Sequence, residues 1–465
     1  MEVGYCKMTA DYISNANAFR NGIFNKFSSG HADLIWLNSS LKDIKRVAVI
    51  AAGSRSGSSL LFSILRRAPG VYSLSGESTP FYKLNGLSLG AFSSDEIPQD
   101  TVISEDQWRG LSRDFLSDSA SDSNETDILP AEETLDRYID ELALRFCLEW
   151  PAVSFSCEVF GRLARRAFRV YTKAHSKFSR EEFYLELLWM LRQEYDVINP
   201  YYYDIPAVLI QNRFPGLEIP CGPPSRDIVI EEPPFILLSP RKKMQKADLS
   251  GKMLLLKTSA DCYRMPFLET IFPGADFKII HLTRNPVASI NGLYDGWLHR
   301  GFFSHNLSAA LKSRNSMLKI AGYSERYEWG KWWWKYDLPG RWEDYTQKRL
   351  EEVCAFQWCC SNKALLEYFK KSRKEYYRVR YEDIIGGLES RKEEIEGIVK
   401  FLGINVDAVG LLGLDKLAVV QATDDPQPYR WKKRKDLLLP LLNDPQLSGI
   451  SEELNYSTEN IKEWF

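Results

Sequence analysis

The residues whose types and spacing could do chemistry first gather in a short segment rich in glycine and serine. Gly53-Ser54-Arg55-Ser56-Gly57 follows an apolar run and precedes Ser58 and Ser59. Glycines let backbone N–H groups turn inward, serine hydroxyls add donors, and the free N–H groups of a helix's first turn favour an anion. Arg55 adds a fixed positive charge. The pattern predicts a loop that cradles a phosphate or a similar anion, with an ordinary strand-to-helix turn as the alternative.

This loop departs from the phosphate loop of nucleoside triphosphatases. That motif, G-x-x-x-x-G-K-S/T, supplies a lysine for the β and γ phosphates and a hydroxyl for magnesium. Here Gly57 comes one position early, and Ser58 stands where the lysine is needed. The segment therefore favours an anion site that works without a metal, and a kinase or ATPase fits it poorly.

A carboxylate follows the next apolar run. Ser75-Gly76-Glu77 comes directly after the short run at residues 71–74. In an open α/β sheet, ligands bind at the carboxyl ends of the strands, so Glu77 is placed at the mouth of the predicted site, where a carboxylate can act as a general base. A solvated loop carboxylate, or an acid in the first turn of a following helix, is the alternative.

A sheet is needed to bring these side chains together. Apolar runs that predict buried strands occur at residues 47–52, 71–74 and 253–259, and at the starts of segments 277–297 and 377–403. Helical patterns follow several of them. Such alternation is typical of an α/β fold with a central, mainly parallel sheet flanked by helices.

The spacing of these runs also predicts how the chain is divided. A core at 46–84 and 251–440 follows an N-terminal segment at 1–45, is interrupted by a mainly helical insertion at 85–250, and precedes a C-terminal tail at 441–465. Within the insertion, we expect an exposed loop at Ser112–Asp127, helices at 134–150 and 181–195, and an ordered, extended connection at Pro200–Pro240.

Composition excludes several classes of protein. The 465 residues include 60 Lys and Arg against 62 Asp and Glu, a net charge of −2, which gives no field for attracting nucleic acid or an anionic membrane. No apolar run is long enough for a leader or a membrane span. The eight cysteines lack zinc-site spacing, so no metal site is predicted. We expect a cytoplasmic protein that binds a small molecule, with its oligomeric state open.

The segment Arg55-Ser56-Gly57-Ser58-Ser59 resembles the 5′-phosphosulfate loop of the sulfotransferases that use 3′-phosphoadenosine 5′-phosphosulfate (PAPS), in the variant of the carbohydrate and tyrosylprotein branches. The resemblance implies the P-loop NTPase-like sulfotransferase fold, donor binding by these five residues, and adenosine 3′,5′-bisphosphate (PAP) as product. It supports Glu77 as base, because the tyrosylprotein branch has a base in a similar Gly-Glu segment. It also places Lys257 near the transferred sulfonate. The implied catalytic set is Arg55, Glu77 and Lys257.

Two further segments match the family in the same order. Residues 277–297 resemble its 3′-phosphate element, in which Arg284 binds the 3′-phosphate together with a serine on the next helix. The family's serine falls at Gly292 here, so Ser289, one turn earlier, is the expected substitute. Residues 377–403 resemble the strand and Y-E-D turn that place a tyrosine, here Tyr381, near the adenine. A packed aromatic at the sheet edge is the alternative for Tyr381.

Three other groups have two interpretations each. Arg430 and Lys432, in the basic run Tyr429–Lys435, contact the donor or belong to a solvated turn. His299 and His305 line the acceptor pocket or are structural. The aromatic segment Trp329–Trp342 forms that pocket or a hydrophobic cluster under a loop.

The sequence thus predicts transfer of a sulfonate group from PAPS to a hydroxyl or amine, with a small metabolite as the favoured acceptor. In-line transfer of this kind depends on positioning and on cations near the developing charge. A nucleotide-binding inactive relative with a regulatory role is the main alternative, and a nucleotide kinase is a third.

Overall fold

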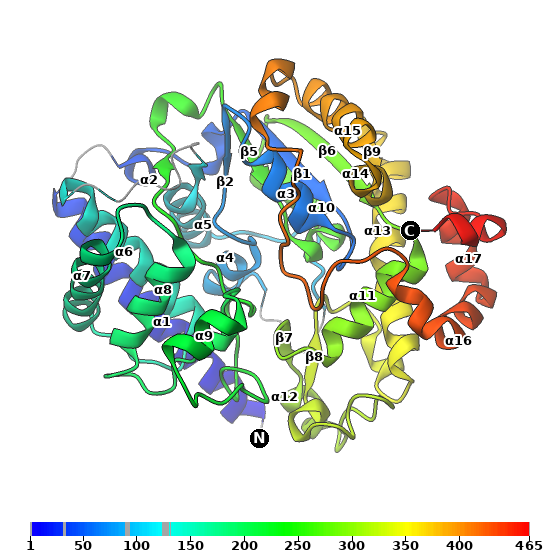
Figure 1. Ribbon diagram of the computed structural model, residues 1–465, viewed down its shortest axis with the longest axis horizontal. Helices are drawn as coiled ribbons and strands as arrows, with labels where there is room; N and C mark the ends of the chain where they lie inside the picture. Colours follow the sequence, from blue (N-terminus) through cyan, green and yellow to red (C-terminus); the bar gives the residue numbers. More distant parts are fainter. Residues whose placement is uncertain (1, 31–33, 89–93, 123–129, 131, 465) are drawn as a thin grey trace.

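A computed structural model describes residues 2–30, 34–88, 94–122, 130 and 132–464. Within them, one sheet has the strand order β4-β3-β2-β5-β1-β6-β9. The parallel strands are β2 (Val71–Ser73), β5 (Met253–Leu256), β1 (Arg46–Ala51), β6 (Asp276–Thr283) and β9 (Tyr376–Arg380). Two short strands, β3 (Ala120–Ser121) and β4 (Lys242–Lys243), extend the β2 edge in antiparallel orientation. The predicted α/β fold with a central, mainly parallel sheet is confirmed (Figure 1).

Helices cover both faces of this sheet. On one face lie α3 (Ser58–Leu65), α14 (Tyr381–Gly386) and α15 (Leu388–Phe401). The other face is covered by α4 (Thr79–Leu84), α5 (Glu105–Asp118), α10 (Met265–Ile271) and α13 (Leu350–Ser372). Because both faces are buried, the central strands are continuous apolar runs, which is why the sequence locates them.

A second hydrophobic core lies beside the sheet. It is formed by α1 (Glu2–Gly30), α6 (Glu132–Glu149), α7 (Cys157–Ala174), α8 (Arg180–Leu191) and α9 (Ala207–Arg213). These helices lie on the left in Figure 1, with the short α2 (Ile35–Asn38) above them. The N-terminal helix therefore packs with the helices of the predicted insertion.

A third cluster lies on the opposite side of the molecule (Figure 1). It combines α13 with α11 (Pro286–Leu298), α12 (Ser308–Ser313), the C-terminal helices α16 (Lys435–Leu438) and α17 (Pro445–Glu453), and the ribbon of β7 (Phe303–Asn306) and β8 (Trp333–Lys335). Among the described residues, no helix is long and apolar enough to cross a membrane.

The exposed loop predicted at Ser112–Asp127 is wrong over its first part. Residues up to Asp118 complete α5, and β3 follows directly; residues 123–127 lie outside the described part of the chain. Asp114 is fully buried, and its carboxylate accepts hydrogen bonds from Arg20 at 3.1 Å and Asn85 at 2.9 Å. Polar residues are tolerated here because distant partners satisfy them.

The connection predicted at Pro200–Pro240 is also only partly extended, since it contains α9. The predicted helix at 134–150 corresponds to α6, and the one at 181–195 corresponds to α8, which ends at Leu191.

Candidate active site

A cleft of about 980 Å³ opens where β1, β2, β5 and β6 end. Side chains from all three predicted donor segments and from the predicted catalytic positions line it: Arg55, Gly57, Ser58, Ser59, Glu77, Lys257, Arg284, Tyr381 and Arg430. Ser56, Ser289, His299, His305 and Lys432 are not among the described residues that form its wall. Segments more than 200 positions apart in the sequence thus meet at the carboxyl ends of the parallel strands. Arg55 and Arg284, which are 229 positions apart, are one example.

The glycine-rich loop is shaped by two residues with left-handed backbone. Arg55 has φ of 65° and Gly57 has φ of 93°, and Gly57 is the N-cap of α3. A Cβ at Gly57 would lie 2.2 Å from the ring of Tyr381. The Tyr381 ring therefore lies directly against the loop, and only glycine fits beneath it.

We predict that Gly57→Ala lowers the free energy of unfolding by about 1–3 kcal/mol, because it combines backbone strain with a steric clash. Chemical denaturation monitored by circular dichroism measures the change. Adding Tyr381→Ala to Gly57→Ala should remove the clash and leave only the backbone strain. If the double variant is no more stable than the sum of the two single effects predicts, the close contact is not the cause.

Glu77 and Lys257 form an ion pair at the base of the cleft. Their Oε1 and Nζ atoms are 2.6 Å apart, and the side chains are 29% and 9% exposed. β2 and β5 are neighbours, and just beyond them the Ser78 N–H donates to Thr258 Oγ1 at 2.9 Å. This link fixes the two residues side by side. The pair therefore places a carboxylate and an ammonium group side by side in the cleft.

Arg284 crosses from the end of β6 to the loop. Its Nη1 donates to the carbonyl of Arg55 at 3.0 Å, and its guanidinium lies 4.6 Å from the Tyr381 ring centroid. Its Nε is buried and has no hydrogen-bond partner among the described residues. Burial lowers the pKa of Arg284, so an anion at this position would stabilise a charge that water reaches poorly.

The turn that carries Arg284 is held by Glu382, a residue that sequence reasoning missed. Glu382 Oε1 accepts from the backbone N–H and the side-chain amide of Asn285, each at 2.9 Å. Its other oxygen accepts from the Tyr456 hydroxyl at 2.9 Å. The Y-E-D turn therefore places Tyr381 in the cleft, and its glutamate fixes the neighbouring turn that carries Arg284.

Gly292, which stands where the sequence resemblance leads us to expect a serine, has a steric reason to be glycine. A Cβ at Gly292 would lie 3.2 Å from the Cβ of Arg55, so a side chain there would press on the loop arginine. The expected substitute, Ser289, is fully buried on α11, and its hydroxyl has no hydrogen-bond partner among the described residues. Its role stays a prediction.

The basic run is docked on α11 through Asp295. Arg430 Nη2 lies 2.8 Å from Asp295 Oδ2, and Arg434 lies 2.7 Å from the other oxygen. Lys432 is exposed, and its ammonium lies 3.9 Å from the ring centroid of Tyr429. Of the two predicted donor contacts, Arg430 lies in the cleft wall and Lys432 lies outside it.

Both histidines lie in structural environments. His305 is buried, with Nε2 3.2 Å from Asp95, and Arg264 reaches the same carboxylate at 2.9 Å. His299 accepts from the Gly301 N–H at 3.0 Å, and burial lowers its pKa to about 3. These contacts favour the structural interpretation of each residue.

The aromatic segment at 329–342 is divided in the same way. The side chains of Trp333, Trp334 and Trp342 are buried in hydrophobic clusters, whereas Tyr336 lines the cleft. The segment thus contributes one ring to the wall and otherwise serves as packing.

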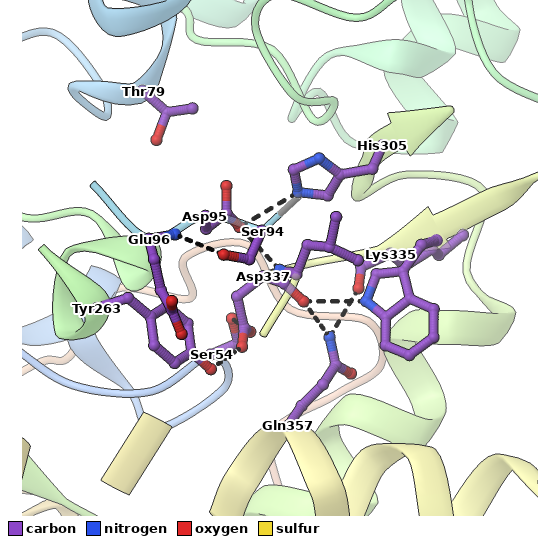
Figure 2. Close-up of polar contacts among 12 residues, drawn as sticks. Ser54, Thr79, Ser94, Asp95, Glu96, Tyr263, His305, Lys335, Asp337 and Gln357 are labelled. Atoms are coloured by element: carbon purple, nitrogen blue, oxygen red, sulfur yellow. Dashed lines mark hydrogen bonds and ion pairs between the residues drawn. The ribbon is translucent and has the colours of Figure 1, made fainter. Parts of the chain in front are cut away.

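A buried polar network contacts the glycine-rich loop through Ser54 (Figure 2). Asp337 accepts from Ser54 Oγ at 2.6 Å and from the Tyr263 hydroxyl at 2.7 Å. The side chain of Gln357 donates to the carbonyl of Asp337 at 2.7 Å. Burial raises the pKa of Asp337 to about 6, and the two hydroxyl donors oppose that rise. This carboxylate anchors the loop through Ser54.

A segment at 417–428 lies over the loop and contributes most of its residues to the cleft wall. Gln421 makes hydrogen bonds to the loop from both its side chain and its backbone. Its side-chain oxygen accepts from Ser59 Oγ at 2.8 Å, and its carbonyl accepts from Arg55 Nη1 at 2.9 Å. Two predicted anion donors are therefore paired with Gln421, and an anion in the loop would have to replace these hydrogen bonds.

Two acidic residues that sequence reasoning missed also line the cleft. Glu231 and Glu232 precede a proline pair, and burial raises their pKa values to about 7 and about 8. Glu231 lies 3.2 Å from buried Arg145, and the charge of Glu77 contributes to the raised pKa values of both residues. Their only sequence signal is a pair of acids directly after an apolar run.

No family model matches the sequence, and no curated protein matches it. Among solved structures, the sulfotransferase domain from the curacin biosynthetic pathway is 12% identical with a TM-score of 0.33, over 89% of this chain and 98% of that domain. The sulfotransferase domain from the Synechococcus PCC 7002 olefin synthase is 14% identical with a TM-score of 0.34, over 90% of this chain and 96% of that domain. Similarity at this level does not identify a reaction or a substrate.

Proposed function

We propose that this protein is a sulfotransferase that uses PAPS and transfers its sulfonate group to a hydroxyl or amine of a small metabolite. The observation that carries the proposal is the convergence, in one cleft, of the anion loop, Arg284 and Tyr381 with the Glu77–Lys257 pair. The buried Nε of Arg284, which lacks a partner among the described residues, fits a phosphate group. The cytoplasm is the compartment that the sequence favours.

The charge and position of each cleft residue suggest its role. PAPS supplies an activated sulfonate on a phosphate leaving group. Arg55, Ser58 and Ser59 would hold the 5′-phosphate, after Gln421 releases two of them. Arg284 would hold the 3′-phosphate, with Tyr381 beside the adenine.

Glu77 and Lys257 are the groups proposed to transfer the proton and to stabilise charge. Glu77 would take the acceptor's proton as the new bond to sulfur forms, and Lys257 would stabilise negative charge on the sulfonate oxygens. The 2.6 Å contact keeps both groups at the same point of the cleft.

We predict that PAP raises the melting temperature at micromolar concentrations, whereas adenosine 5′-phosphate does so far less, because only PAP has a 3′-phosphate for Arg284. Arg284→Ala should remove most of this difference. Arg314→Ala, at an exposed surface position, is the control. Equal shifts for both nucleotides in the unaltered protein would refute the 3′-phosphate assignment.

Activity is tested by PAP release from PAPS in the presence of a metabolite extract. Release that depends on the extract, together with mass-spectrometric detection of a sulfonated product, would support the proposal. PAP binding without release under any condition would favour an inactive nucleotide-binding relative. Magnesium-dependent phosphate transfer from a nucleoside triphosphate would favour a kinase.

A further inference from the structure

A group of arginines lies at the end of the cleft that is remote from Arg284. Arg66, directly after α3, and Arg180, the first residue of α8, both line the cleft. Arg66 Nε lies 2.7 Å from Asp122 Oδ2, and Arg241 Nε lies 2.8 Å from the other oxygen of that carboxylate. One carboxylate therefore bridges two guanidinium groups.

The positive charge of this group is incompletely neutralised. Burial, together with the charges of Arg241 and Arg180, lowers the pKa of Arg66 to about 9. Arg241 is 4% exposed and is not among the described residues that line the cleft, so it adds positive charge behind Arg66 rather than a contact to a ligand. An excess of positive charge beside the cleft favours a further anion.

The acidic residues nearby do not supply that anion. Arg180 pairs with the adjacent Glu181, whose carboxylate oxygen is 3.8 Å away, beyond hydrogen-bond distance. Asp204 also lines this part of the cleft, but burial raises its pKa and its carboxylate accepts a hydrogen bond from the backbone of Gln421. Arg180 is 52% exposed and is free to turn toward a ligand.

Contacts with neighbouring residues hold the side chains of Arg66 and Arg241 in place. The guanidinium of Arg66 lies 4.9 Å from the ring centroid of Phe62. Arg241 Nη2 donates to the carbonyl and the hydroxyl of Ser73, at 3.1 and 2.9 Å. Ser73 ends β2, the strand that leads to Glu77, so the group is built onto the same rigid elements as the ion pair.

The separation from the anion loop follows from helix geometry. Seven residues along α3 separate Ser59 from Arg66, which corresponds to about 10 Å at 1.5 Å per residue. The wall of the cleft also includes apolar residues, among them Phe62, Ile205, Pro206, Pro234, Ile236 and Leu237. The cleft therefore offers an anion loop, a second cationic group and apolar wall residues.

We propose that Arg66 and Arg180 form a subsite for an anionic group of the acceptor, a carboxylate or phosphate bound about 10 Å along α3 from the anion loop. The inference rests on the proposed function, because it takes the cleft to hold an acceptor. It narrows the acceptor class to molecules that carry both a nucleophile and an anionic group. The specific claim is that the subsite selects a negatively charged group over an uncharged one.

The test measures binding, so it does not depend on turnover. Isothermal titration calorimetry on the PAP-saturated protein would compare ω-hydroxydecanoate, its uncharged methyl ester and ω-hydroxydecyl phosphate. We expect both anions to bind at least about tenfold more tightly than the ester, as a charge-assisted hydrogen bond allows. A stronger response to one anion would distinguish carboxylate from phosphate recognition.

Two variants and a matched control locate the effect. Arg180→Gln, at an exposed position, and Arg66→Lys, which keeps the charge but loses the planar fork, should each reduce the preference for the anions. Arg162→Gln, on the exposed surface of α7, should leave it unchanged. Equal affinity for acid and ester in the unaltered protein would overturn the subsite, as would a preference that survives Arg180→Gln or is lost equally in Arg162→Gln.

Failure of the subsite and failure of the proposed function are distinguishable. PAP binding is measured first, and its absence would count against the proposed function. In that case the same titrations on the nucleotide-free protein still report whether Arg66 and Arg180 select an anion. If PAP binds but no anion preference is found, only the subsite is refuted.

Discussion

Replacing Glu77 by glutamine is expected to lower kcat by ~10² to 10⁴, the usual contribution of a positioned general base. The substitution keeps the shape of the side chain and removes its charge. PAP affinity should stay nearly unchanged, because Glu77 contacts Lys257 rather than the phosphate-binding residues. Steady-state kinetics with a saturating acceptor, combined with PAP titration, measures both quantities.

The pH profile provides the control for this assignment. The dependence of kcat/KM on pH is measured for the unaltered enzyme and for Glu77→Gln, and a limb that is present in the first and absent in the second would assign that limb to Glu77. Partial recovery of activity by added formate or acetate would support the role. Turnover within a few-fold of the unaltered enzyme, with an unchanged profile, would contradict it and make Glu232, in the same cleft, the next candidate.

The parts of this architecture that the sequence predicts are those encoded locally. The buried strands are recognisable because both faces of the sheet are covered, which leaves unbroken apolar runs such as Val47–Ala51. The loop is recognisable because Gly57 must adopt a left-handed backbone at the start of α3. The rule that sites lie where parallel strands end then places Glu77 and Lys257 together.

The parts that it does not predict depend on partners far away in the chain. Asp337 anchors Ser54 across 283 positions, and nothing in the sequence pairs the glycine-rich loop with this carboxylate. Asp114 contributes to the wrong prediction of a loop at the end of α5. A carboxylate on a buried helix face is stable only with hydrogen-bond donors, here Arg20 and Asn85, and the sequence does not reveal these partners. The sequence gives no signal for Gln421 either. This residue lies in a segment without regular structure, and its hydrogen bonds to Ser59 and Arg55 depend on the fold.

These long-range interactions also change what the predicted residues can do. A loop known only from its sequence presents Arg55 and Ser59 as free donors. In the fold, Gln421 pairs with both, so the free energy of the proposed PAPS binding would include the cost of breaking these two hydrogen bonds. The same reasoning applies to the Glu77–Lys257 pair, where each charge is partly satisfied before any substrate binds.

Replacing Lys257 by methionine is expected to lower kcat by ~10² to 10³, the cost of removing one preorganised group that stabilises charge in a transition state. Methionine suits the site because Lys257 is 9% exposed and its stem is packed. PAPS turnover with a saturating acceptor measures the loss. Lys252→Met, at an exposed position just before the same strand, is the matched control and should leave kcat unchanged.

The double variant Glu77→Gln with Lys257→Met separates catalysis from simple pairing. If the two residues act on the same transition state, the second substitution should cost much less than it does alone, because groups that act as a unit are strongly non-additive. Fully additive losses would mean that the 2.6 Å contact does not couple the two residues in the reaction. A Lys257→Met enzyme within a few-fold of the unaltered kcat would refute the role of the lysine in the transition state.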